Sequence, residues 1–182
     1  MKRTGFNMSK STSFALRTTL GAALLAIAGI ASASVTTTTT VDADQNTFAN
    51  AVGADSGIFL EAGQGFTVSA SGLWRNDPNT FYNAGPDGNT VQGPLTQDGL
   101  TANFGTLVAE IGGGPVFKVG STFSGIAATS GELEFFFWDT DTGTTNNSGD
   151  VSAIATAVPE PTSFVLMGLG LGLVGLARRR KI

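Results

Sequence analysis

The sequence predicts an all-β protein built as one antiparallel β-sandwich of about eight strands, with a removable segment at its front and a short membrane helix at its back. Apolar and polar residues alternate in several short segments, which is the period-two pattern of a strand with one buried face. Gly (25 residues) and Thr are plentiful and charged residues make up only 13% of the chain, which favours strands joined by tight turns. Between the two ends, no segment keeps helical periodicity over three turns.

The first 33 residues have the pattern of a secretory signal peptide. A basic stretch precedes an apolar run from Leu20 to Ile30, and the small residues Ala31-Ser32-Ala33 follow it. This order predicts cleavage after Ala33. The alternative, a transmembrane anchor, is disfavoured because the apolar run is too short to span a bilayer.

The mature chain is expected to begin with a lead strand or linker over residues 34–48, followed by the sandwich over residues 49–158. Five consecutive Thr, Thr36 to Thr40, lie between Val35 and Val41, and β-branched residues favour a strand there over a polar linker. The other expected strands contain the apolar segments Ile58–Leu60, Phe66–Ala70, Leu107–Ile111, Val116–Val119, Leu133–Phe137 and Val151–Val158.

Two polar segments interrupt this pattern and are expected to be long loops: Leu73 to Gly99 and Asp139 to Asp150. The second reads DTDTGTTNNSGD, and its carboxylates, amides and hydroxyls are oxygen donors of the kind that calcium takes six to eight of. The same residue types also populate solvated turns for conformational reasons alone. Composition by itself favours the turn, and an EF-hand is a poor fit because Gly143 is at the fifth position of the loop.

Charge and missing residue types exclude several function classes. The chain has no Cys and no His, which removes thiolate catalysis, Ser–His–Asp triads and His/Cys zinc sites. Residues 34–158 hold 13 acidic residues but only Arg75 and Lys118, a net charge of 2 − 13 = −11, which opposes nucleic-acid binding and attracts divalent cations. Carboxylate pairs such as Glu132/Glu134 or Asp139/Asp141 are better explained as solvated strand or turn positions than as a glycosidase pair, so we predict that the protein is not an enzyme.

The last 24 residues, 159–182, form a second targeting segment, after the signal peptide. A helix over the apolar run from Thr162 to Ala177 would be about 24 Å long, short of the roughly 30 Å hydrocarbon core. Pro159, Glu160 and Pro161 precede this run, and the cations Arg178, Arg179 and Arg180 follow it. With these residues the tail resembles the PEP-CTERM sorting signal, in which an exosortase recognises and cleaves the tail of proteins that often accompany exopolysaccharide production.

Five motifs follow one another in the middle of the chain: GIFLEAGQGFTVSASG from Gly57, GPDG from Gly85, DGL from Asp98, GTLVAEIG from Gly105, and Asp139 followed by NNSG from Asn146. With these motifs in this order, the chain resembles the LecA-type galactophilic lectins. The order of these motifs covers roughly Asn50 to Val158. The resemblance implies a calcium-dependent, galactose-binding-like β-sandwich that holds a sugar through its bound ion.

Carried onto this sequence, the resemblance implies a calcium site and a sugar site that share residues. The ion's ligands would be the side chains of Asp139, Asn146 and Asn147 with the backbone carbonyls of Gly143 and Asn76. Sugar hydroxyls would meet Asp139, Asn146, Thr140 and Asp98, provided that the two long loops converge. Leu95 stands where the family has a sugar-contacting His, so galactose specificity is not implied. Trp74, Trp138, Phe81 and Tyr82 are alternatives as sugar-stacking platforms or as core.

These observations predict an exported, calcium-dependent carbohydrate-binding protein of the cell surface or extracellular matrix, associated with exopolysaccharide. Before sorting, the short helix would hold it in the inner membrane with the domain outside, because the cationic cluster stays in the cytoplasm. A structural matrix protein without sugar binding is the main alternative, and an enzyme acting on glycosides is the third.

Overall fold

Nine strands and one 3-10 turn make up the regular structure of the sandwich. The computed structural model describes residues 33–75, 83–140 and 147–159, together with Gly170 and Gly172, which are helical. The elements lie within the unit Ser32–Glu160. They are β1 (Val35–Asp42), η1 (Phe48–Asn50), β2 (Ala54–Leu60), β3 (Gly65–Arg75), β4 (Asp87–Gln97), β5 (Leu100–Ile111), β6 (Phe117–Lys118), β7 (Thr122–Ile126), β8 (Gly131–Phe137) and β9 (Ser148–Ala157).

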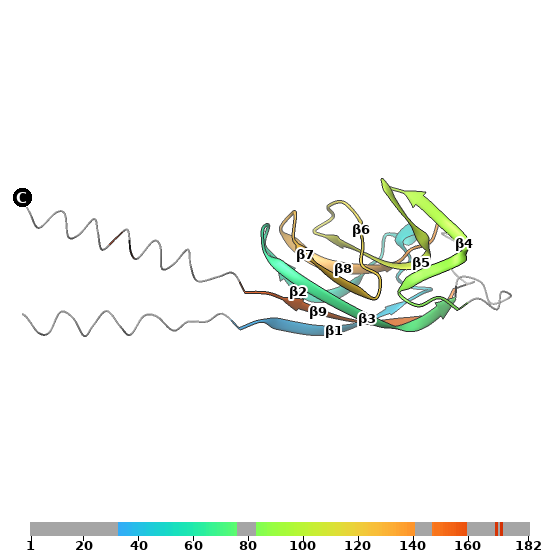
Figure 1. The fold of residues 1–182 in the computed structure, drawn as a ribbon, viewed down its shortest axis with the longest axis horizontal. Helices are drawn as coiled ribbons and strands as arrows, with labels where there is room; N and C mark the ends of the chain where they lie inside the picture. Colours follow the sequence, from blue (N-terminus) through green and yellow to red (C-terminus); the bar gives the residue numbers. More distant parts are fainter. Residues whose placement is uncertain (1–32, 76–82, 141–146, 160–169, 171, 173–182) are drawn as a thin grey trace, which may run out of the picture. The chain divides into compact units, whose positions relative to one another are not determined.

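One layer is a four-stranded antiparallel sheet in the order β1-β9-β3-β7. Figure 1 shows β1, β9 and β3 running together along one side of the sandwich. Alternation sets the two faces: Val151, Ala153 and Ala155 of β9 are buried, because every second side chain of a strand points to the same face. The expectation of a strand in the Thr-rich segment is confirmed, since β1 pairs with β9 from Val35↔Ala157 to Asp42↔Asp150.

The second layer has the strand order β2-β8-β5-β4, and β6 pairs with the later part of β5. Leu133, Phe135 and Phe137 of β8 point inward and are fully buried, as the period-two spacing of these apolar residues predicts. Both sheets are antiparallel, so the prediction of an antiparallel β-sandwich is confirmed.

The core between the sheets is centred on an aromatic contact. Trp74 and Phe137 lie edge to face with ring centroids 4.8 Å apart, a preferred geometry for aromatic pairs. The indole Nε1 of Trp74 donates to the carbonyl of Gly105 at 2.7 Å, and Gly105 has φ +70°, a conformation that favours glycine. A side chain at this position would also press on Trp74 and Phe137. The β5 strand therefore turns at Gly105 against the core.

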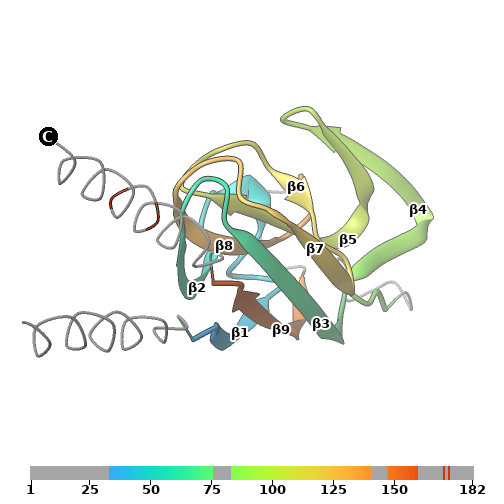
Figure 2. The same ribbon diagram turned by 60° about the vertical axis from the view of Figure 1, so that its left-hand side comes forward.

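A smaller apolar cluster covers the outer face of the second sheet. The first half of β5 and the end of β4 form a hairpin that rises from the sandwich (green-yellow in Figure 2). Side chains of this hairpin pack on residues of β5 and β8 that alternate with the core residues. The cluster consists of Ala102, Val108, Val116, Phe136 and Trp138, with Phe48, Leu95 and Leu100 packed against it.

The expectation of one long loop from Leu73 to Gly99 is wrong. β3 continues to Arg75, and Asp87–Gln97 forms β4, which leaves only Asp98 and Gly99 between β4 and β5. Both turn residues have positive φ, 45° and 79°, as a two-residue hairpin turn of the Asp-Gly type requires. The alternation of apolar and polar residues did not predict β4, because most of its residues are polar and about half of them are solvent-exposed.

The two ends of β9 define the two ends of the sandwich. At the Ser148 end, β9 lies beside Trp74 and Arg75 of β3. At the Ala157 end, it lies beside Phe66 of β3 and Val35 of β1. Among the described residues, no helix has the length and apolar character needed to cross a membrane. The expected signal peptide and most of the expected C-terminal helix fall outside the described residues.

Candidate functional site

Asp139 lies two residues after the end of β8, at the Ser148 end of the sandwich. Its side chain is only 2% exposed, although burying a carboxylate is costly unless polar partners compensate. Its backbone carbonyl accepts a hydrogen bond from Nε2 of Gln97 at 3.0 Å. This hydrogen bond therefore joins the β4–β5 hairpin to Asp139, the first residue of the second polar segment.

Asn147, the last residue before β9, completes a buried polar pair with Asp139. Its Nδ2 donates to Oδ2 of Asp139 at 3.0 Å, and its side chain is 7% exposed. Its other amide atom, Oδ1, is buried and has no hydrogen-bond partner among the described residues. Leaving a buried acceptor unsatisfied costs about 1–3 kcal/mol, and an amide oxygen is a ligand that calcium accepts. The donor set at this position therefore fits a hard cation.

The other expected metal ligands lie outside the described residues: Asn76, Gly143 and Asn146. Thr140 is described and exposed next to Asp139, a position compatible with the contact to a sugar that the resemblance implies. In the described part of the chain, no group of three or more His, Cys, Asp or Glu residues gathers to hold a metal. The expected set contains a single carboxylate, so amide and carbonyl oxygens would have to supply most of its ligands.

Asp98 occupies the tip of the β4–β5 hairpin, one residue from the Gln97–Asp139 contact. It is exposed and close enough to the outer face of β5 to act on Glu110. Burial raises the pKa of Glu110, and the neighbouring carboxylates of Glu134 and Asp98 raise it further. Gln97, the neighbour of Asp98, contacts Asp139, and Asp98 itself lies on a tight turn rather than in a long loop.

Three residues considered for sugar contact belong to apolar packing. Trp74 is 1% exposed and Trp138 is fully buried, so neither presents a ring face to a ligand, and of the two alternatives for these residues the structure shows core packing. Leu95 packs against the outer cluster, and its carbonyl accepts from Nε1 of Trp138 at 3.3 Å. Phe81 and Tyr82 lie outside the described residues.

Gln97 is a residue of the candidate site that the sequence did not indicate. Its side chain joins the hairpin to Asp139 across 42 positions of the chain. The available signal was the Asp98-Gly99 pair, which is a strong hairpin indicator when strands flank it. A hairpin there would have made Gln97 a strand-end residue whose side chain reaches a neighbouring element.

The end of β9 leads into the sorting motif. Pro159 is described and half-buried, whereas Glu160, Pro161 and the cations Arg178, Arg179 and Arg180 lie outside the described residues. A family model described as the PEP-CTERM protein-sorting motif matches residues 157–181. The chain carries a PEP-CTERM sorting tail. This tail indicates export through an exosortase and a surface or extracellular location.

The sandwich in front of the sorting tail has the fold of a lectin domain. Eight solved chains match it. One, described as "EclA N-terminal domain; PllA-like lectin", is 29% identical, with a TM-score of 0.52, and the match covers 67% of this chain and 96% of that chain. No curated protein sequence matches the chain. The expected combination of a PEP-CTERM tail with a lectin-like domain is therefore confirmed, and the chain is an exported, lectin-like protein.

Proposed function

We propose that this protein binds carbohydrate outside the cell through a calcium ion held at the Ser148 end of the sandwich. The observation that carries the proposal is the buried Asp139–Asn147 pair with its unsatisfied Asn147 Oδ1. The pair lies at the ends of an oxygen-rich segment, on a domain whose solved relative is a PllA-like lectin. A buried carboxylate beside an unsatisfied amide oxygen is better explained by a cation than by packing alone.

The calcium ligands in this proposal are the side chains of Asp139, Asn146 and Asn147 and the carbonyls of Gly143 and Asn76. A calcium ion takes six to eight oxygen ligands, so five protein groups leave room for two hydroxyls of a sugar. When bound, the ion supplies a positive charge that orders those hydroxyls. The net charge of −11 on residues 34–158 favours cation capture by the whole domain.

The sugar contacts would come from Asp139, Asn146, Thr140 and Asp98. Asp98 is exposed on a hairpin tip that Gln97 ties to Asp139, so its carboxylate is available to accept from a hydroxyl group. Leu95 packs on the outer cluster and adds no polar contact. We therefore expect binding of a galactose-like or other hexose that is weaker than a site with a polar group at Leu95 would give.

The sorting tail supports a location outside the cell for this carbohydrate binding. An exosortase would process the protein after a transient stage in the inner membrane, with the domain on the outer side. The released or attached domain would then bind exopolysaccharide at the cell surface or in the matrix. Binding and sorting together account for both parts of the chain without an enzymatic role.

A glycan array tests the proposal with the exported protein recovered from cells that make the full chain. Binding should appear with calcium and disappear with chelator. Asp139→Asn should abolish it, whereas the matched change Asp150→Asn, at an exposed position of β9, should leave it intact. Glycan binding that survives the chelator would contradict the calcium site. A protein that binds calcium but no glycan would favour the structural matrix alternative.

A further inference from the structure

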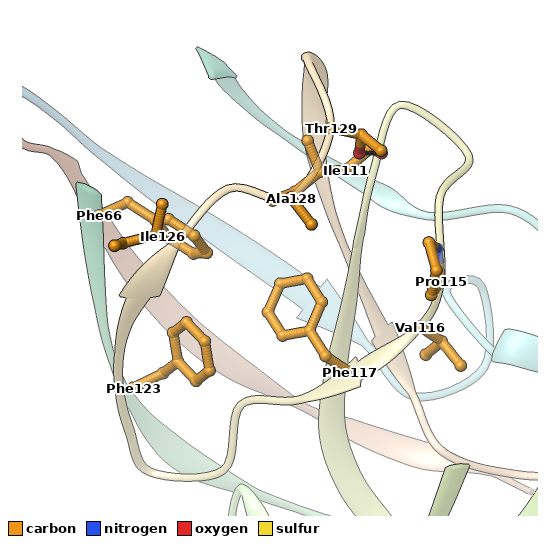
Figure 3. Close-up of a pocket in the computed structure, with 9 residues that line it drawn as sticks. All are labelled: Phe66, Ile111, Pro115, Val116, Phe117, Phe123, Ile126, Ala128 and Thr129. Carbon is orange, nitrogen blue, oxygen red and sulfur yellow. Dashed lines mark hydrogen bonds between the residues drawn. The ribbon is translucent and has the colours of Figure 1, made fainter. Parts of the chain in front are cut away.

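An apolar pocket lies between the sheets, away from the Asp139–Asn147 pair. Its volume is about 260 Å³. Figure 3 shows Phe117 near its centre, with Phe66, Phe123 and Ile126 on one side and Ile111 and Thr129 above. The only side-chain polar atom among these six residues, Oγ1 of Thr129, donates to the carbonyl of Ile111 at 2.9 Å. The pocket therefore presents almost only carbon to whatever fills it.

Three phenyl rings form its wall. Ring centroids are 5.2 Å apart for Phe66 and Phe123, 5.1 Å for Phe117 and Phe123, and 6.1 Å for Phe66 and Phe117. Phe117 and Phe123 are only partly buried although they pack against the core. The volume is roughly nine times the 30 Å³ share of one liquid water, and a water needs two to four polar partners to be held in place. An apolar occupant suits this pocket better than water does.

The pocket opens at the Ala157 end of the sandwich. Phe66 is paired with Ala157, and Gly65 is paired with Ile126. Ile126 is 72% exposed, and Val35 and Val158, at the same end of this sheet but on other strands, are also exposed. The sorting motif begins at residue 157, so the chain leaves the sandwich toward its apolar tail from the same end that carries the pocket and these exposed side chains.

This end is also poor in charge. The turns 61–64, 112–116 and 127–131 contain one charged residue, Glu61. Its Oε2 accepts a hydrogen bond from Oγ of Ser130 at 2.9 Å. Exposed Glu132 follows the last of these turns. Most of the other acidic residues of this domain, whose net charge is −11, lie elsewhere, so approach of this end to an apolar phase costs less desolvation than approach of a strongly acidic face.

We propose that the pocket takes an acyl chain of a bilayer phospholipid while the sorting tail holds the domain at the membrane. The inference rests on the membrane stage of the proposed function and not on its sugar site. An unbranched hydrocarbon chain matches a carbon-lined pocket that offers no hydrogen bond. Occupation of the pocket would set the Ala157 end against the bilayer and direct the Asp139–Asn147 pair away from it.

Photo-cross-linking tests this proposal with the full chain. The protein is reconstituted in phosphatidylcholine vesicles that contain a phosphatidylcholine with a diazirine in one acyl chain, irradiated, digested and mapped by mass spectrometry. Cross-links are expected in the sorting tail and, in addition, in peptides that span residues 111–129. Cross-links in the tail alone overturn the pocket and leave the membrane stage standing. Their absence from both regions overturns the pocket and the membrane stage together.

Two matched variants separate binding in the pocket from chance collision with lipid. Ile126→Ser changes a residue at the pocket mouth that is exposed, so the core is kept, and it should lower cross-linking of residues 111–129 at least threefold relative to the tail. Leu73→Ser changes a residue that is 61% exposed near the Ser148 end and should leave that ratio unchanged. An equal ratio in both variants would overturn the proposal. Asp139→Asn should have no effect on it.

Discussion

Asn147 and Asp139 are joined side chain to side chain by a 3.0 Å hydrogen bond across eight positions of the chain. Asp139 follows β8 in the second sheet, and Asn147 precedes β9 in the first. The bond therefore links the two layers of the sandwich at one end. It also brings the ends of segment 140–146 together, so an ion bound there would interact with both layers at once.

Removal of the Asp139 carboxylate should abolish calcium-dependent stabilisation. A ligand that binds only the folded state adds about 2.7 kcal/mol at a hundredfold excess over its dissociation constant. Thermal melts of the unmutated protein should therefore differ between calcium and chelator, and those of Asp139→Ala should coincide. Asp150→Ala is the matched control and should keep the difference. Identical melts for the unmutated protein would rule out calcium binding of useful strength.

Asn147→Asp should make stability conditional on calcium. The change keeps the shape of the side chain but replaces the donor Nδ2 with a second carboxylate oxygen next to Asp139. In chelator, the lost hydrogen bond and the repulsion should destabilise the fold by about 2 kcal/mol. Saturating calcium should restore most of this loss, because the ion would lie between the two carboxylates. Urea unfolding with and without calcium measures the effect, and Asn103→Asp on β5 controls for added charge. A variant as stable as its parent in chelator would contradict the geometry.

Asp98→Asn should weaken sugar binding without changing calcium binding. Asn tolerates the positive φ of this turn position, so the hairpin should survive. A neutral acceptor in place of a charged one costs about 1 kcal/mol, or about fivefold in Kd. Calorimetric titration with the sugar identified on the array, alongside calcium melts, checks both expectations. A change in the calcium melt with unchanged sugar affinity would remove Asp98 from the sugar site.

Glu110→Gln should stabilise the protein at neutral pH and not at acid pH. Burial, with Glu134 and Asp98 nearby, raises the pKa of Glu110, so the folded state binds more protons than the unfolded state between the unfolded pKa of about 4.3 and the raised folded value. Stability contributed by this group is therefore present at low pH and falls as the pH rises through that window. The gain from Glu110→Gln should appear at pH 7 and vanish near pH 4. Urea unfolding at both values, compared with Glu132→Gln at an exposed position of β8, checks the sign.

The mature protein should begin at Ser34. Cleavage after Ala33 fits the small-residue rule and leaves β1, which starts at Val35, complete. N-terminal sequencing of the exported protein measures this directly. A start beyond Val41 would remove at least seven of the eight residues of β1 and expose β9, and that result would exclude the structure described for the mature form.

Strands with one buried face were predictable from sequence, whereas strands that depend on distant partners were not. Phe66 and Val68 alternate with polar residues and point inward as expected. On the opposite face, however, Phe136 of β8 and Trp138 just after it are buried, because the returning β4–β5 hairpin and Phe48 cover them. Local alternation carries no information about a cover supplied by Leu95 or Leu100.

The candidate site was predictable in its residue types and not in its connections. The lectin resemblance implied Asp139 and Asn147 as calcium ligands, whereas the composition of the segment alone favoured a solvated turn. Their mutual hydrogen bond and the contact from Gln97 depend on how the sheets pack. The aromatic residues failed for the same reason: Trp74 and Trp138 are large enough to stack on a sugar, but packing buries both.

The five threonines of β1 specify the pairing register of this strand only weakly. After a slip of two residues along β9, positions 36, 37 and 38 would still hold Thr, since a strand repeats every second residue. What fixes the strand lies at its end: Val41 is fully buried, and the amide of Ala43 donates to the carbonyl of Gly149 at 3.0 Å. Insertion or deletion of two threonines would therefore be absorbed at the free N-terminal end, without moving the Ser148 end. The distance between the cleavage point and the sandwich can thus vary over evolution while the candidate site stays in place.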